Sequence, residues 1–177
     1  MAKSKKGFTI IEVVLVLAIA GLIFLMVFIA LPALQRGQRN TQREDDISRF
    51  LTAGNSYQTN NGGKIPFKVA NGTTVTVDSN FVHRYIDKNC TPNTNASGYT
   101  CDESSNEFRD PDGTTYDLQG TGVGAQTLNE EWGTHVIHAY VNATCGDEGT
   151  TLAGTGNRQY ALMYVLEGNA ITCNDNH

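Results

Sequence analysis

The chain has 177 residues, a length that suits one domain, and its formal net charge at pH 7 is −5. The charge is uneven, because residues 54–177 carry six Lys or Arg and fourteen Asp or Glu, a net of −8. An acidic region of this kind argues against nucleic acid as a direct partner, since a polyanion needs a basic surface.

The first predicted element is a helix of membrane length. No charged residue occurs from Val13 to Gln35, a run of 23 residues. At about 1.5 Å per residue this helix reaches roughly 35 Å, which is enough to cross a bilayer core. Lysines at positions 3, 5 and 6 precede the run. They favour a cytoplasmic N-terminus, with the rest of the chain on the other side of the membrane.

Three interpretations of this N-terminal segment compete. The apolar run is too long for a secretory signal peptide, and FIALPAL is a poor cleavage site. A plain membrane anchor fits the length but does not explain Glu12, because an ionised carboxylate in hydrocarbon costs several kcal/mol. The third interpretation rests on the residues around this glutamate.

The stretch KKGFTIIEVVLVLAIAGLI resembles the class III signal of type IV prepilins. In that family a membrane peptidase cuts after the glycine, here Gly7, and the new first residue, here Phe8, is N-methylated. A glutamate five residues into the mature chain, here Glu12, pairs with the N-terminal amine of a neighbouring subunit as the helices bundle. The sequence FTIIEV departs from the commoner FTLIEL by one aliphatic exchange. The resemblance thus assigns Gly7 and Phe8 to processing and Glu12 to assembly.

The same resemblance implies a structural subunit, with no catalytic residue and no cofactor. Such a subunit sits in the cytoplasmic membrane, in contact with lipid, with its head outside. A prepilin peptidase and N-methyltransferase processes it, and the pilus assembly machinery polymerises it with other pilin subunits into a helical surface filament. Adhesion and twitching motility would follow from the family and not from particular residues here.

A filament-forming major pilin is the favoured interpretation, and three alternatives stay open. A minor pilin, or a pseudopilin of type II secretion, would carry the same signal. A monomeric, membrane-anchored binding domain is the alternative from another class, and it predicts that Gly7 is never cut.

Four segments are expected along the chain: a leader (1–7), a transmembrane half of the helix (8–35), an amphipathic half (36–62) and a β-rich head (63–177). After the apolar run, Ile47, Phe50 and Tyr57 recur at helical spacing and define one face. The pattern predicts one helix from about Thr9 to Asn61, which ends at the glycines of NNGGKIP.

Charged residues in the second half of this helix are interpreted as surface groups. Arg36, Arg39 and Arg43 are expected opposite the apolar face, either solvated or facing another subunit. Asp45 and Arg49 are expected to form an i,i+4 pair in the favourable order.

Short β-like segments follow the helix. Five of them are expected to be strands: residues 73–78, 114–119, 134–141, 159–166 and 170–173. Residues 81–86 are ambiguous, and Ser79 or Asn80 is the expected cap if they form a helix. The stretches 89–106 and 120–131 are rich in Asn, Thr, Ser and Gly and are expected to be loops.

These segments predict an α+β fold, in which a small antiparallel sheet packs on the C-terminal half of the long helix. The last two strands, joined by EGNA, are expected to form a hairpin. The apolar positions expected to face the helix are Val75, Val77, Val136, Tyr140, Leu162, Tyr164 and Leu166.

All four cysteines follow the membrane-length segment: Cys90, Cys101, Cys145 and Cys173. An even count in an exported domain predicts two disulfides, for which three connectivities are possible. Proximity along the chain favours Cys90–Cys101 and Cys145–Cys173. No CxxC pair occurs in the sequence, which argues against a zinc site.

Asp110 and Asp112, beside Gly113, are weak candidates for a calcium site, and type II pseudopilins have a similar DP-x-G segment near such a site. A turn is the better interpretation, because Asp-Pro and Asp-Gly both initiate turns and a calcium loop needs more oxygen ligands. His135 and His138 fall on opposite faces of a strand and are expected at the surface. No catalytic set of residues stands out, so no enzyme activity is predicted.

Overall fold

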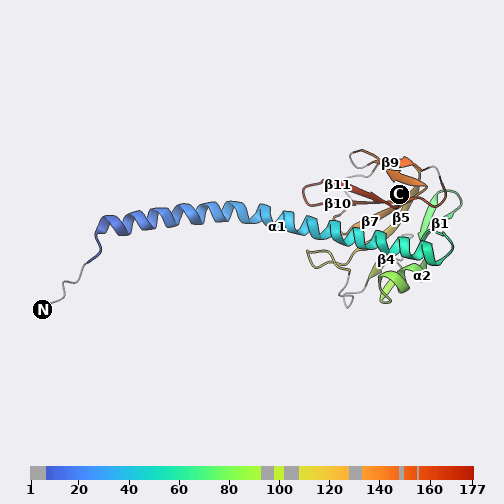
Figure 1. The fold of residues 1–177 in the computed structure, drawn as a ribbon, viewed down its shortest axis with the longest axis horizontal. Helices are drawn as coiled ribbons and strands as arrows, with labels where there is room; N and C mark the ends of the chain where they lie inside the picture. Colours follow the sequence, from blue (N-terminus) through green and yellow to red (C-terminus); the bar gives the residue numbers. More distant parts are fainter. Residues whose placement is uncertain (1–6, 93–97, 102–107, 128–132, 148–149, 155) are drawn as a thin grey trace. The chain divides into compact units, whose positions relative to one another are not determined.

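The structure is a computed structural model that describes residues 7–92, 98–101, 108–127, 133–147, 150–154 and 156–177. The chain divides into two compact units, of which the first ends at Gln38 and the second begins at Arg39. Figure 1 labels α1, α2 and several of the strands.

Helix α1 is the longest element and runs from Ile10 to Asn60, 51 residues. This confirms the long helix that the sequence predicts, and Pro32 lies inside it. The helix ends where expected, because Gly62 and Gly63 take left-handed φ angles of 67° and 83°. The Gly63 N–H donates to the carbonyl of Gln58 at 2.7 Å, which satisfies one carbonyl at the helix terminus.

The second unit contains a six-stranded sheet in the order β11-β10-β7-β5-β4-β3. Its strands are β3 (Cys90–Pro92), β4 (Gly98–Cys101), β5 (Asp117–Val123), β7 (Val136–Val141), β10 (Tyr160–Val165) and β11 (Ile171–Asp175). The fold is α+β, as predicted, and β10 and β11 form the expected antiparallel hairpin.

The sheet is mixed and not wholly antiparallel, because β5 and β7 pair in parallel. A parallel pair requires a crossover connection of about a dozen residues or more. The connection from Val123 to Val136 is long enough to return the chain to the starting end of β5. The sequence pattern of an individual strand does not indicate whether it pairs with its neighbour in parallel or antiparallel.

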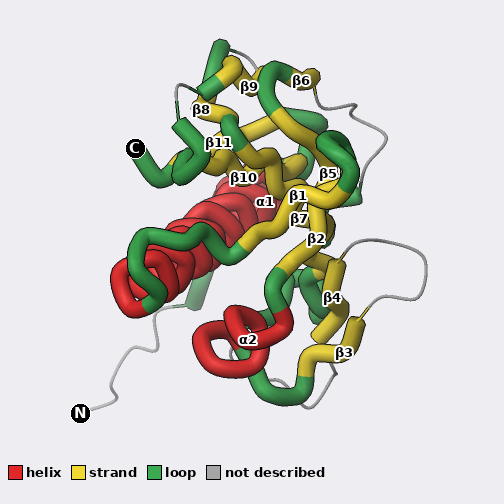
Figure 2. Tube along the Cα trace, turned by 90° about the vertical axis from the view of Figure 1, so that its right-hand side faces the viewer, coloured by secondary structure: helices red, strands yellow, loops and turns green. Residues whose placement is uncertain are grey.

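Two smaller sheets complete the second unit (Figure 2). Strands β1 (Phe67–Ala70) and β2 (Thr74–Val77) form a hairpin. The other small sheet has the order β6-β9-β8 and consists of β6 (Gln126–Thr127), β9 (Thr150–Ala153) and β8 (Ala143–Cys145).

Two stretches that were predicted as loops therefore contain strands. Strands β3 and β4 lie within residues 89–106, and the end of β5 and all of β6 lie within residues 120–131. These segments are rich in Asn, Thr, Ser and Gly, and the buried Cys90 and Cys101 that they contribute to the core form no alternating apolar pattern. Backbone pairing holds them in the sheets, and a prediction based on apolar alternation does not detect it.

The ambiguous residues after β2 are helical. A short helix α2 (Ser79–Phe81) continues into a wider turn of π-helix, η1 (Val82–Ile86). The N-cap is Asp78 and neither of the two expected residues, and its side chain accepts from the Asn80 N–H at 2.9 Å. Aspartate satisfies the free N–H groups of a helix start as serine does.

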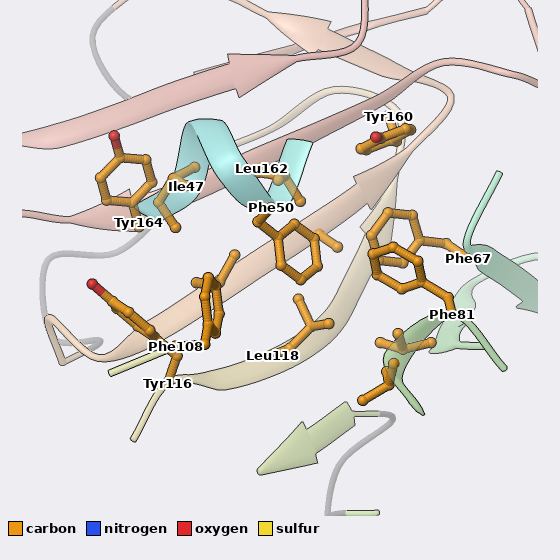
Figure 3. Close-up of a cluster of buried hydrophobic side chains, with 14 of the residues drawn as sticks. Ile47, Phe50, Phe67, Phe81, Phe108, Tyr116, Leu118, Tyr160, Leu162 and Tyr164 are labelled. Atoms are coloured by element: carbon orange, nitrogen blue, oxygen red, sulfur yellow. The ribbon is translucent and has the colours of Figure 1, made fainter. Parts of the chain in front are cut away.

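The core of the second unit lies between α1 and the six-stranded sheet (Figure 3). Ile47, Phe50 and Tyr57 of α1 are all buried there, which confirms the predicted apolar face. Phe50 packs edge-on against Phe81 with ring centroids 5.3 Å apart. Leu162 of β10 belongs to the same cluster.

The predicted inward face of β7 was wrong by one residue. Ile137, Ala139 and Val141 belong to the main core, whereas Tyr140 packs in a second cluster with Met163. Strand β7 lies between β10 and β5 and is buried on both faces. Its sequence therefore shows no polar and apolar alternation from which the register could be read.

Candidate processing and assembly site

The predicted processing residues lie directly before α1. Gly7 and Phe8 are in coil, and Phe8 is 90% exposed. A side chain added at Gly7 would meet nothing within 4 Å. The segment is therefore open to another protein.

Glu12 lies in the first turn of α1 and forms a reciprocal cap with Thr9. The Thr9 N–H and the Thr9 hydroxyl donate to Glu12 Oε2 at 2.9 and 2.8 Å. The Glu12 N–H donates to Thr9 Oγ1 at 3.4 Å. This is a capping box, whose signature is Ser or Thr followed three residues later by Glu. The signature is present in FTIIE, so the sequence pattern alone could have predicted this cap.

The capping box holds the Glu12 carboxylate at the start of the helix, where the helix dipole favours a negative charge. Gly7 and Phe8 lie in the coil five and four residues before Glu12. Their roles in processing and assembly stay predictions.

Among the described residues of the first unit, none covers the apolar part of α1. The large apolar residues from Phe8 to Leu34 are exposed, including Ile11 at 74% and Phe28 at 72%. By length and composition this helix could cross a membrane. A helix that is apolar on all sides requires lipid or other helices around it.

Arg39 and Arg43, which belong to the part of α1 inside the second unit, bind carboxylates of the same unit. This corrects the expectation that they lie on a solvated or subunit-facing surface. Arg43 Nε and Nη2 donate to the two oxygens of Asp110 at 2.6 Å each. Arg43 Nη1 donates to Glu167 Oε1 at 3.0 Å. Arg39 Nε and Nη2 donate to the two oxygens of Glu167 at 2.5 and 2.7 Å. We call these four residues the arginine clamp.

The position of Arg43 follows from helix geometry. Arg43 precedes Ile47 by four residues, so it lies one turn away on the buried face and not opposite it. The guanidinium would be costly to bury without a partner. The hydrogen bonds to Asp110, and then those to Glu167, raise the pKa of Arg43 and keep it charged. The bonds from Arg39 and Arg43 lower the pKa of Glu167 to about 2.

The two calcium candidates form a turn that is held by this clamp. Both Asp110 oxygens accept from Arg43, and Oδ1 also accepts from the Asp112 N–H at 3.0 Å. Asp112 accepts from the Thr114 N–H at 2.8 Å, and Gly113 has a φ of 94°. The charge of Asp110 is therefore already balanced by a guanidinium. The described residues contain no group of three or more Asp, Glu, His or Cys that could hold a metal ion.

The structure has two disulfides, which are the pairs that lie nearest along the chain. Cys90–Cys101 joins β3 to β4, with both residues buried. Cys145–Cys173 joins β8 to β11 and closes a sequence separation of 28 residues. The second disulfide connects β11, an edge strand of the six-stranded sheet, to β8 of the three-stranded sheet.

Two other expectations about polar residues were wrong. His138 is buried, with Nδ1 3.0 Å from Thr121 Oγ1, and burial lowers its pKa to about 3. His135 is exposed as expected. Arg49 pairs with Asp46 at 3.6 Å, three residues away, and not with Asp45. Helical residues three and four apart are both neighbours, so the sequence alone does not choose between them.

Comparison with known proteins bears on the N-terminal segment. A family model described as the prokaryotic N-terminal methylation motif matches residues 2–28. The matched segment contains Gly7, Phe8 and Glu12, and it supports a type IV pilin-like prepilin. The motif occurs in pilins and pseudopilins alike, so it defines the class and not the particular filament. No curated protein and no solved structure matches the chain.

Proposed function

We propose that the chain is the major structural subunit of a type IV pilus. It is held in the membrane as a prepilin, cut after Gly7, methylated on Phe8 and polymerised through residues 8–35. The observation that carries the proposal is the methylation motif on a helix whose apolar side chains are exposed on all sides.

The exposed helix supports both states of the proposed subunit. Before assembly lipid covers the apolar side chains, with the N-terminal lysines in the cytoplasm and the head outside. In the filament the corresponding helices of neighbouring copies cover them. Both environments remove the same apolar surface from water, so the hydrophobic effect supplies little driving force for transfer from lipid to filament.

Glu12 would supply the specificity of that transfer. The two bonds from Thr9 satisfy part of its hydrogen-bonding capacity, but Thr9 carries no compensating charge. Cleavage after Gly7 would create an α-amino group on Phe8, whose ordinary pKa is about 7.7. A neighbouring subunit's amine would then neutralise Glu12 in a medium where an unpaired charge is costly.

The head of the proposed subunit suits export and a structural role. Its two disulfides are typical of domains that fold outside the cytoplasm. The balance of the Asp110 charge by Arg43 favours a head that does not depend on calcium. This observation favours a pilin over a pseudopilin whose loop is organised by calcium.

Mass spectrometry of fibres sheared from cells tests the proposal. We expect the subunit to begin at Phe8 and to carry one methyl group on its amine. Gly7→Val should leave the uncut chain in the membrane and abolish fibres. Ala2→Val, which changes the leader but not the cleavage site, should have no effect.

Two results would contradict the proposal in different ways. A chain that is always recovered uncut and monomeric would indicate the membrane-anchored binding domain. A chain that is cut and methylated, but absent from surface fibres by immunogold electron microscopy, would indicate a minor pilin or a pseudopilin.

A further inference from the structure

We propose that closure of the turn between β10 and β11 is required for α1 to dock on the head, and that Arg43 and Glu167 transmit this requirement. The inference concerns the head and holds whether or not the chain forms filaments. It rests on the arginine clamp, which joins residues of α1 to a turn more than 120 positions later in the chain.

Arg43 makes docking conditional because its charge is buried. Its side chain is 1% exposed, and it lies one helical turn from Ile47, which is 0% exposed. The part of α1 around these residues therefore packs on the sheet only if the guanidinium enters the interior with it. An unpaired guanidinium would be strongly unfavourable there, so its acceptors must already be in place.

Glu167 is held on α1 by its backbone as well as by its carboxylate. The Glu167 N–H donates to Asn40 Oδ1 at 3.0 Å, and Asn40 Nδ2 donates to the Glu167 carbonyl at 3.2 Å. Asn40 Oδ1 also accepts from Arg43 Nη1 at 3.2 Å. These bonds require the backbone of the turn, and not only a nearby carboxylate, to be in its native position.

The turn depends on two residues in the left-handed region. Gly168 and Asn169 have φ angles of 93° and 65°, and the Leu166 N–H donates to the Ala170 carbonyl at 2.7 Å across the turn. Glu167 precedes this pair directly. Its position is therefore set when β10 and β11 pair through the turn.

The hairpin, formed by β10 (Tyr160–Val165) and β11 (Ile171–Asp175), is more than 110 positions away from residues 39–47, so docking of this part of α1 depends on a segment that is distant in the sequence. A head that lacks a closed final hairpin would leave the beginning of its helix segment, residues 39–47, undocked. Pairing of β10 with β11 is therefore a condition for docking of residues 39–47 on the sheet.

Two matched glycine substitutions in the full chain, kept in detergent micelles, test the inference. Gly168→Ala disfavours the β10–β11 turn, and Gly72→Ala disfavours the β1–β2 turn, where Gly72 has a φ of 79°. At both positions an added Cβ meets nothing within 4 Å, so each change acts on backbone conformation and causes no clash.

The readout is hydrogen–deuterium exchange of the backbone amides of residues 39–47, because a helix segment that no longer packs on the sheet loses the tertiary packing that supplies most of its stability in water. We expect Gly168→Ala to accelerate this exchange on the order of tenfold. Gly72→Ala should leave it unchanged and affect β1 and β2. Glu167→Gln, which keeps the turn and removes the charge, should accelerate exchange of residues 39–47 without opening β10 and β11.

Three outcomes would overturn the inference. Equal acceleration of residues 39–47 by both glycine variants would show general destabilisation. Opening of β10 and β11 in Gly168→Ala with unchanged exchange of residues 39–47 would show that the helix docks without the turn. Unchanged exchange of this segment in both Gly168→Ala and Glu167→Gln would show that Glu167 has no such role.

Discussion

The guanidinium of Arg43 and the carboxylate of Asp110 form a two-point ion pair at 2.6 Å, with side chains that are 1% and 0% exposed. The pair joins the middle of α1 to a turn 67 positions later in the chain. A charge pair that is buried on both sides must be kept intact, because either group alone would be unsatisfied in the interior.

Arg43→Met should therefore destabilise the head by about 3–5 kcal/mol, since it leaves Asp110 buried without its partner. Chemical denaturation of the full chain in detergent, followed by tryptophan or tyrosine fluorescence, measures this. Arg36→Met is the matched control on an exposed position and should change stability by less than about 0.5 kcal/mol. A loss in the Arg43 variant no larger than in this control would show that the pair does not stabilise the head.

The stability of the head should decrease in acid partly through Glu167. Its pKa is lowered from 4.5 to about 2 by the bonds from Arg39 and Arg43. A lowered pKa means that the unfolded state binds the proton more readily, so this stabilisation is present above pH 4.5 and is lost as pH falls through 2. Glu167→Gln should flatten the pH dependence of the unfolding free energy in this window. A variant with the wild-type slope would contradict the assignment.

His138 should make a separate contribution at higher pH. Burial lowers its pKa from 6.5 to about 3, so the folded head holds it neutral. Its contribution is present above pH 6.5 and decreases as pH falls toward 3, because the unfolded state takes up the proton first. His138→Gln should remove this part of the slope between pH 6.5 and 4.5, where Glu167 contributes little. The comparison uses denaturation curves at several pH values, and parallel curves for variant and wild type would count against it.

Removal of divalent cations should leave the head unchanged, because Arg43 already balances the charge of Asp110. We expect the same melting temperature with EDTA and with millimolar calcium. A clear rise in melting temperature with calcium, lost in Asp112→Asn, would show a cation site at this turn and would favour a pseudopilin.

Glu12→Ala should leave the protein in the membrane but abolish filaments. The variant lacks the carboxylate that would form an ion pair with the Phe8 α-amino group of a neighbouring subunit. Membrane fractionation and electron microscopy of cells measure the two effects separately. Asp45→Ala, which removes an exposed carboxylate later in α1, is the control and should assemble normally. Normal filaments from Glu12→Ala would refute the proposed pairing.

The N-terminal motif and helix α1 could be predicted because their signals are local. Helical spacing identified Ile47, Phe50 and Tyr57 as one buried face, and the glycines after Asn61 marked the end of the helix. The match of the methylation motif to residues 2–28 likewise depends on a continuous stretch of sequence.

The parallel pairing of β5 with β7 and the inward face of β7 could not be predicted, because each depends on how separate strands meet. The spacing to Ile47 could have placed Arg43 on the buried face of α1, but its partners Asp110 and Glu167 come from turns that are distant in the sequence. The sequence by itself determined a long apolar helix with a processing signal and a β-rich head. Only the tertiary structure decided that Arg43 meets Asp110 and Glu167, because a charged residue on a buried helix face is stable only where the fold supplies its partners.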